Sequence, residues 1–236
     1  AMAMTLLLIL LFTALLPAFA SWLAFISGAR QVPTAFLLPS AGFSYYLAFD
    51  KPYKTSLANE FWWSLLLIHG LGCNASMWDA VVAALPTDMG LVIPELRGHG
   101  DSTLGWRLPS VDQWADDLVR LLRDKEIEAP AIAGLSLGGY TALGIAAAHP
   151  GFARAFAFLS TSAAPDDDAG RARRAAALAT IRREGWRRFA AGFIPSVLNA
   201  TGPQFPVHSK HLMTMFERAG DSGLPPTLMA LAARPD

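Results

Sequence analysis

Ser136 lies in the sequence GLSLGG, residues 134–139, where a serine is flanked by glycines two positions away on either side. Residues 129–133 before it are apolar, and residues 140–148 after it are rich in alanine and have helical composition. A serine at such a strand-to-helix turn is typical of a nucleophile whose hydroxyl projects from the edge of a sheet. The glycines would permit the close backbone approach of a sharp turn. The alternative interpretation is a glycine-rich connection without chemistry.

Strand-like and helix-like segments alternate through the middle of the chain. Continuous apolar runs are typical of strands buried on both faces of a parallel sheet, and short connections to helices predict right-handed crossovers. Because sites in such sheets lie at the carboxyl ends of the strands, we expect the turn at residues 69–72 to lie near Ser136. The predicted strands are residues 43–49, 65–68, 90–93, 129–133 and 153–159, and the predicted helices are residues 76–85, residues 111–122 after an N-cap at Ser110, and residues 140–148.

The composition changes after Ser160. Residues 165–236 show helical stretches without a clear strand, interrupted by prolines, and predict a helical cap over the carboxyl end of the sheet. Residues 171–188 hold seven arginines and a single acid, Glu184, so this helix presents either a solvated face or one that lies on a membrane surface. The fold class predicted is α/β, a mostly parallel sheet with flanking helices plus the cap, with residues 30–164 as the core.

The N-terminal segment, residues 1–29, carries no charged side chain. One interpretation is a secretory signal peptide with a cleavage site after Ala20, which would make the protein secreted or periplasmic. Another is a membrane anchor, since the apolar residues 5–26 approach the roughly 20 residues that a spanning helix needs. A third is a buried or poorly ordered segment of a cytoplasmic protein. Membrane contact through residues 5–26 is therefore a possibility that the sequence leaves open.

Composition sets further bounds on the protein. A chain of 236 residues is long enough for one domain with an insertion, and its net charge of zero indicates no nucleic-acid partner. The single cysteine, Cys73, excludes an intrachain disulfide. Cys73 has no basic neighbour or helix start beside it, so we expect a small buried residue rather than a reactive thiol.

Three motifs, in this order, resemble the α/β-hydrolase superfamily: HGLG at residues 69–72, RGHGDS at residues 97–102 and GLSLGG at residues 134–139. The resemblance covers residues 65–236, and pieces such as SMWD at residues 76–79 are similar to small esterases and enol-lactone hydrolases. It implies a serine hydrolase that acts on a small-molecule carboxylic ester and needs no metal or organic cofactor.

The resemblance also implies roles for particular residues. Ser136 would be the nucleophile, and the backbone N–H groups of Leu71 and Leu137 would form the oxyanion hole. Two amides from separate turns would then meet where a carbonyl oxygen becomes negative, which agrees with the expected sheet geometry. His69 and His99 occupy positions of histidines that stabilise turns, so we expect structural rather than catalytic roles for both.

The chain departs from the family pattern after its last predicted strand. Members of the superfamily order their triad as nucleophile, acid and histidine, yet no later strand or histidine-bearing loop is evident. The histidines of the cap region are His208 and His211, and His149 fits a helix end. Asp166 lies where some relatives place the acid, but it also fits a helix N-terminus. The acid and base are therefore unassigned, and the alternative function is a catalytically incomplete binding or membrane-associated module. A shortened sheet would also expose an apolar edge, which favours a homodimer.

Overall fold

The computed structural model describes residues 35–40, 43–48, 64–86 and 89–234. The apolar segment at residues 1–29, with its expected signal peptide or anchor, lies outside the described residues. Strands and helices alternate as predicted, with boundaries that differ from the expectation by up to a few residues. The strands are β1 (Ala35–Ser40), β2 (Phe43–Ala48), β3 (Ser64–Ile68), β4 (Gly90–Pro94), β5 (Ala131–Leu135) and β6 (Ala155–Leu159), and the helical elements are η1 (Ala75–Trp78), α2 (Asp79–Val82), α3 (Val111–Asp124), α4 (Leu137–Ala148), α5 (Asp168–Glu184), α6 (Trp186–Val197) and α7 (Phe205–Ala232).

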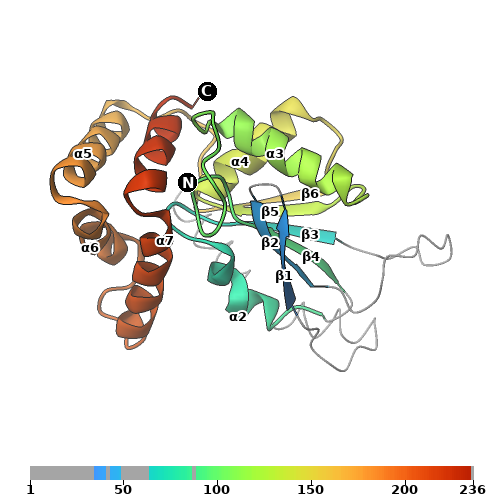
Figure 1. Cartoon of the computed structure of the whole chain (residues 1–236), viewed down its shortest axis with the longest axis horizontal. Coiled ribbons are helices and arrows are strands. Elements are labelled where there is room, and N and C mark those ends of the chain that lie inside the picture. The colour runs from blue at the N-terminus through green and yellow to red at the C-terminus, as the bar shows by residue number, and fades with distance from the viewer. Residues whose placement is uncertain (1–34, 41–42, 49–63, 87–88, 235–236) are drawn as a thin grey trace.

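The described strands form one mostly parallel sheet in the order β1-β2-β4-β3-β5-β6 (Figure 1). β4, β3, β5 and β6 are parallel to one another, whereas β1 pairs antiparallel with β2, and β2 antiparallel with β4. At the centre, Leu66 of β3 lies opposite both Val92 of β4 and Ile132 of β5. This register brings the ends of β3 and β5 to one edge of the sheet, and it confirms the predicted α/β class.

Helices cover both faces of the sheet (Figure 1). Leu66 and Ile68 point towards α3 and α4 and pack in one cluster with Trp114 of α3. Leu67, between them, points to the opposite face and packs with Trp78 of η1. Successive side chains of a strand alternate between faces, so a run of apolar residues is required to fill both.

The two helices after β3 and β4 begin as side-chain caps dictate. The N-cap predicted at Ser110 is confirmed, because its hydroxyl accepts a hydrogen bond from Gln113 N at 3.0 Å. The helix predicted over residues 76–85 is shorter than expected. It consists of the 3₁₀ turn η1, which starts at the Asn74 cap, and four residues of α2. Pro86 follows, and a proline disfavours helical geometry in the residue before it.

The helices α5, α6 and α7 lie together on one side of the sheet and form the helical cap (Figure 1). The expectation that prolines break this region into short helices holds in part: α7, residues 205–232, consists of two helical segments, but they are divided at Gly220 and not at a proline. Pro206 occupies the first turn, where no intrahelical N–H bond is needed, and Pro225 and Pro226 follow the kink, near the start of the second segment. Of the helices that the structure describes, none combines the length and apolar character required to cross a bilayer.

Candidate functional site

Ser136 stands at the tip of a strained turn between β5 and α4. Its backbone has φ 52° and ψ −108°, a conformation that residues with a side chain rarely adopt. The strain is held in place by hydrogen bonds on both sides: Ser136 N donates to the carbonyl of Leu159 at 2.8 Å, and Ser136 O accepts from Tyr140 N at 3.0 Å. Such over-determined backbone strain clusters at functional sites.

The flanking glycines are required by close backbone contacts. A Cβ atom on Gly134 would lie 2.1 Å from the carbonyl oxygen of Gly138. A Cβ atom on Gly138 would lie 2.2 Å from the carbonyl oxygen of Ile68 at the end of β3. The sharp turn predicted from the motif is therefore confirmed, and it holds the start of α4 against the neighbouring strand.

The turn after β3 lies beside the serine. A Cβ atom on Gly70 would lie 3.9 Å from the Cβ of Ser136, and the turn is closed by a hydrogen bond from Cys73 N to Gly70 O at 3.1 Å. Leu137 is the first residue of α4, so its N–H lies outside the intrahelical ladder. Among the residues that the structure describes, neither the Leu71 nor the Leu137 amide donates a hydrogen bond. Within the described residues, one of these uncommitted amides thus belongs to the turn beside Ser136 and the other to the residue directly after it.

His69 and His99 are fully buried under this site, with ring centroids 5.0 Å apart. His69 Nε2 accepts from Leu96 N at 3.0 Å and Nδ1 donates to Gly70 O at 2.9 Å, which links the turns after β3 and β4. Burial lowers the pKa of His69 to about 3, with a further contribution from His99, and burial lowers the pKa of His99 to about 4. Both rings are neutral at pH 7, as a structural role requires.

The remaining histidines have other surroundings. His149 pairs with Asp116 at 3.0 Å at the end of α4, and His211 Nε2 lies 3.4 Å from the carbonyl oxygen of Ser76. Within the described part of the chain, no imidazole forms a hydrogen bond with the Ser136 hydroxyl. His208 and His211 are thus not placed as the base in this conformation.

The carboxylate of Asp166 is bound by two arginines, and no described histidine forms a hydrogen bond with it. Its carboxylate accepts from Arg174 of α5 and from Arg234 Nη2 at 3.0 Å, just beyond α7. The hydrogen bond from Arg174, aided by Arg234, lowers the pKa of Asp166 to about 2. Arg234 also lies 4.0 Å from the ring centroid of Tyr140 in α4. Asp166 therefore fastens the cap to the core, while the neighbouring Asp167 is the N-cap of α5.

Two residues at the site were not singled out from the sequence. Thr161, just after β6, donates its hydroxyl proton to Ser136 O at 3.2 Å. Phe216 of α7 is fully buried, and its ring fills the space where a side chain on Gly72 would lie, 2.3 Å from the ideal Cβ position. Apolar helical spacing could have marked Phe216 as buried, but no local pattern indicates which turn it covers.

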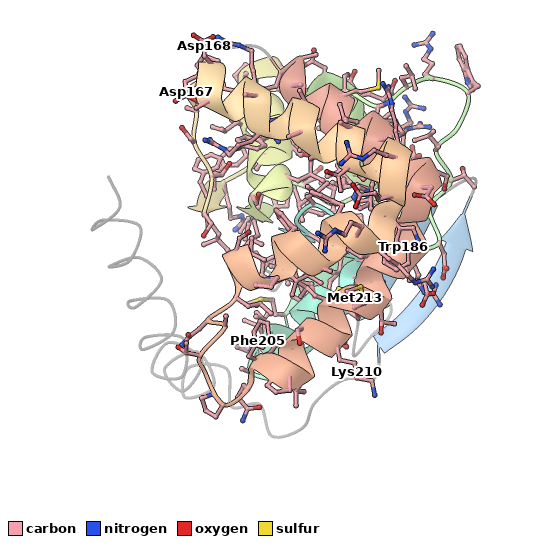
Figure 2. The ribbon with its side chains drawn as sticks, turned by 90° about the vertical axis from the view of Figure 1, so that its left-hand side faces the viewer. Asp167, Asp168, Trp186, Phe205, Lys210 and Met213 are labelled. Atoms are coloured by element: carbon pink, nitrogen blue, oxygen red, sulfur yellow. The ribbon has the colours of Figure 1, made fainter. Side chains whose placement is uncertain are left out.

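The cap also carries a groove on its outer side (Figure 2). Its volume is about 490 Å³, and a smaller one of about 260 Å³ lies between Pro109 and the second part of α7. Neither groove is lined by Ser136, Leu71 or Leu137. The larger groove is lined chiefly by Trp186, Ile194, Pro195, Phe205, Lys210 and Met213.

Known proteins share both sequence and fold with this chain. A pimeloyl-[acyl-carrier protein] methyl ester esterase of Aromatoleum aromaticum is 36% identical over 86 residues, which are 36% of this chain and 32% of that protein. A thermophilic esterase from Thermogutta terrifontis has a TM-score of 0.68 and 25% identity, over 86% of this chain and 74% of that one. The enol-lactonase from Burkholderia xenovorans has a TM-score of 0.69 and 22% identity, over 84% and 74%.

The chain spans about a third of the length of the first of these relatives. The sequence model of the alpha/beta hydrolase family matches residues 65–236, which begin in β3 and include the turn at Leu71, the elbow at Ser136 and the cap. The structural neighbours reproduce the same sheet and flanking helices. The chain therefore belongs to the alpha/beta hydrolase family.

Proposed function

We propose that the protein hydrolyses carboxylic esters through an acyl-enzyme on Ser136. The observation that carries the proposal is the position of Ser136, strained at φ 52° beside the turn of Leu71 and directly before the first amide of α4. The esterase names of its relatives support an ester as the substrate class. We expect small or medium acyl groups.

Each step of the proposed reaction uses groups on these two turns. The Ser136 oxygen attacks the ester carbonyl carbon, and the carbonyl oxygen becomes an oxyanion that accepts hydrogen bonds from the N–H groups of Leu71 and Leu137. The carbon–oxygen bond to the alcohol then breaks, and the alcohol leaves with the proton that the Ser136 hydroxyl has lost. Water attacks the acyl-enzyme in the same way, so the acid is released and Ser136 regains its proton.

The two amides are suited to this role because they need no reorganisation. Loss of one oxyanion donor typically lowers turnover by about 10²–10³. Backbone donors cannot be removed by mutation, so the serine is the residue to test. We expect hydrolysis of p-nitrophenyl butyrate by the wild-type chain and loss of that activity in Ser136→Ala. Equal rates in the two proteins would remove Ser136 from the chemistry.

A second candidate function is a catalytically incomplete hydrolase module that binds a partner. The observation that favours it is the lack of a hydrogen bond between the Ser136 hydroxyl and an imidazole in the described part of the chain. An oxyanion hole without its base keeps only a residual rate. A fluorophosphonate probe separates the two functions, because labelling of Ser136 requires an activated hydroxyl. Labelling supports the hydrolase, and no labelling supports the binding module.

A further inference from the structure

An exposed apolar surface lies where the loop between β4 and α3 runs beside the second part of α7 (Figure 1). In this loop Trp106 is 85% exposed and Leu108 is 66% exposed. Met229 of α7, which lines the smaller groove together with Leu108, is 43% exposed. We call these three residues the loop patch. Large apolar side chains that gather at a surface mark a contact with a partner or with lipid.

The smaller groove, of about 260 Å³, continues the loop patch inwards between the loop and α7. Its polar groups are few, and its acid, Asp112, lies in the first turn of α3, where a negative charge stabilises the helix. The apolar residues of its walls are Leu108, Pro109, Val111, Pro226, Met229 and Ala230. The loop patch is therefore the outer part of a continuous apolar surface.

The loop that carries Trp106 is firmly held at its base. Arg97 donates two hydrogen bonds to a buried carboxylate of α3, and a side chain on Gly105 would overlap the Arg97 guanidinium. Gly98 packs against α7 so closely that a side chain on Gly223 would overlap the Gly98 carbonyl oxygen. Because its base is already ordered, the loop loses little conformational freedom when Trp106 enters a contact.

Arg107 gives the loop patch a positive charge that no described carboxylate neutralises. Its guanidinium lies 4.3 Å from the ring centroid of Trp106, and it forms no ion pair within the described residues. Arg97 and Arg234, at the base of the loop and in the groove, are both bound by carboxylates. The surface around Trp106 thus combines exposed apolar side chains with one available cation, which complements a negatively charged partner.

The arginine-rich stretch at residues 171–188 is the other surface that the sequence associates with a membrane. Within it and the adjoining start of α6, no large apolar side chain is exposed. Five of its seven arginines pair with carboxylates, namely Arg171, Arg174, Arg183, Arg187 and Arg188. These pairs favour the solvated helix face over a face that lies on lipid.

We propose that the loop patch rests on the surface of a phospholipid bilayer that contains anionic lipids. Tryptophan is enriched at membrane interfaces because its ring is apolar and its N–H remains hydrated, so Trp106 and Leu108 enter the interface. Arg107 keeps its charge among the phosphates while its stem lies along apolar groups. A bilayer is favoured over a protein partner because residues 5–26 form a largely apolar run of roughly the length that a membrane-spanning helix needs. This contact does not depend on the chemistry proposed for Ser136.

Cys73 allows the contact to be measured with a single dye. As predicted, it is a small buried residue, 6% exposed, and burial raises the pKa of its thiol to about 12. It is also the sole cysteine of the chain. A cysteine placed at an exposed position therefore reacts with a nitrobenzoxadiazole iodoacetamide, whereas Cys73 does not. The thiolate sulfur bonds to the methylene carbon, iodide leaves, and the attached dye emits more strongly and at shorter wavelength in apolar surroundings.

The experiment uses the full chain with the dye at one of three exposed positions. Trp106→Cys places the dye ring where the indole was, in the loop patch. Val207→Cys places it at an exposed apolar position in the first turn of α7, and Arg173→Cys places it on α5. Each chain is mixed with vesicles of phosphatidylcholine, alone or with a minor share of phosphatidylglycerol. Because all three side chains are exposed, none of the substitutions removes a core contact.

On the mixed vesicles we expect the emission of the dye at position 106 to shift to shorter wavelength, and its quenching by aqueous iodide to fall by at least about threefold. The dyes at positions 207 and 173 should stay in water. Residues 5–26 are able to hold the chain on a vesicle by themselves, so the surroundings of the dye, and not the bound fraction, decide the result. A dye at position 106 that remains in water, or equal shifts at all three positions, overturns the proposal.

The charge is tested by Arg107→Gln in the chain labelled at position 106. We expect the lipid concentration needed for half of the emission change to rise about fivefold on mixed vesicles and to stay the same on phosphatidylcholine alone. Arg173→Gln, in the same labelled chain, is the control and should change neither. An equal response of the two variants removes Arg107 from the contact. If the dye at position 106 shifts only when the protein concentration is raised without vesicles, the loop patch is an interface between copies, and the bilayer contact is overturned.

Discussion

His69 Nε2 accepts a hydrogen bond from the backbone N–H of Leu96 at 3.0 Å and so joins the turns after β3 and β4. This bond needs a neutral ring. Burial lowers the pKa of His69 to about 3 and that of His99 to about 4, from an ordinary value of 6.5. Between pH 6.5 and the lowered pKa values of the folded state, the unfolded chain therefore binds more protons than the folded one. Stability is complete above pH 6.5 and decreases as the pH falls.

We expect each of the two histidines to lower the free energy of unfolding by roughly 1 kcal/mol per pH unit between pH 6.5 and 4. Urea unfolding across this range measures the slope. His99→Asn should reduce the slope by the share of one histidine. If His99→Asn leaves the slope unaltered, the loss of stability at low pH does not come from the buried histidines.

The second prediction concerns the elbow glycines. In Gly134→Ala the new methyl group would meet the Gly138 carbonyl oxygen at 2.1 Å, and a backbone atom cannot give way as a flexible side chain can. We expect a loss of more than about 4 kcal/mol, or no folded protein. The matched control is Gly192→Ala in α6, where a Cβ meets no atom within 4 Å and alanine is the better helix former. Similar stabilities of the two variants by thermal unfolding would argue against the observed turn.

The third prediction concerns the junction between cap and core. Asp166 is 12% exposed and holds both Arg174 and Arg234. Asp166→Asn removes the charge that these arginines share, and we expect a loss of about 2 kcal/mol in urea unfolding. Asp168→Asn is the control, because its pair with Arg171 is exposed and should contribute less than about 1 kcal/mol. Equal losses would show that Asp166 does not fasten the cap.

Most of the sheet and the elbow could be predicted because their determinants are local. Apolar runs mark the central strands, Ser110 marks a helix start, and the glycines around Ser136 permit one kind of turn. The structural role expected for His69 is confirmed, although its partner Leu96 lies 27 residues away, and burial together with His99 keeps its ring neutral. The apolar runs, the cap at Ser110 and the glycine spacing around Ser136 each depend on residues within a few positions of one another.

The cap could not be predicted in the same way, because its form depends on contacts between distant segments. Nothing near Phe216 indicates that its ring meets Gly72, and nothing near Asp221 indicates a bond to Trp186. The prolines of α7 did not mark its break: Pro206 lies in the first turn, where a proline is harmless, Pro225 and Pro226 lie inside the second segment, and the chain leaves helical geometry at Gly220. The roles of Ser136, Leu71 and Leu137 stay predictions that enzymatic assays must test.

The fourth prediction concerns self-association through β6. Among the described strands β6 lies at the edge of the sheet, and its Phe158 is 39% exposed and stacked on Phe156. An apolar edge strand favours pairing with a second copy. We expect a concentration-dependent dimer in sedimentation velocity, which Phe158→Lys shifts to monomer. Trp106→Lys changes an even more exposed apolar residue in a loop and should have no effect. A monomer at all concentrations would contradict the homodimer expected from the sequence.

The fifth prediction concerns Arg97, which anchors the loop after β4 to α3. Its guanidinium donates through Nε and, at 2.9 Å, through Nη2 to the two carboxylate oxygens of Asp117, whose side chain is 2% exposed. Lysine keeps the charge but cannot supply two parallel N–H donors. We therefore expect Arg97→Lys to lower the free energy of unfolding by about 1–2 kcal/mol.

The loss in Arg97→Lys should come from geometry and not from charge. Arg187→Lys provides the comparison, because Arg187 pairs with Glu217 on the surface, where both side chains are more than half exposed. The free energy of unfolding of Arg187→Lys, measured in urea, should differ from that of the wild type by less than about 0.5 kcal/mol. Arg97→Ala should cost more than Arg97→Lys, since it leaves the buried Asp117 carboxylate without a cation. If all three variants unfold at the same urea concentration as the wild type, the loop is held by its backbone contact with Gly223 and not by the ion pair.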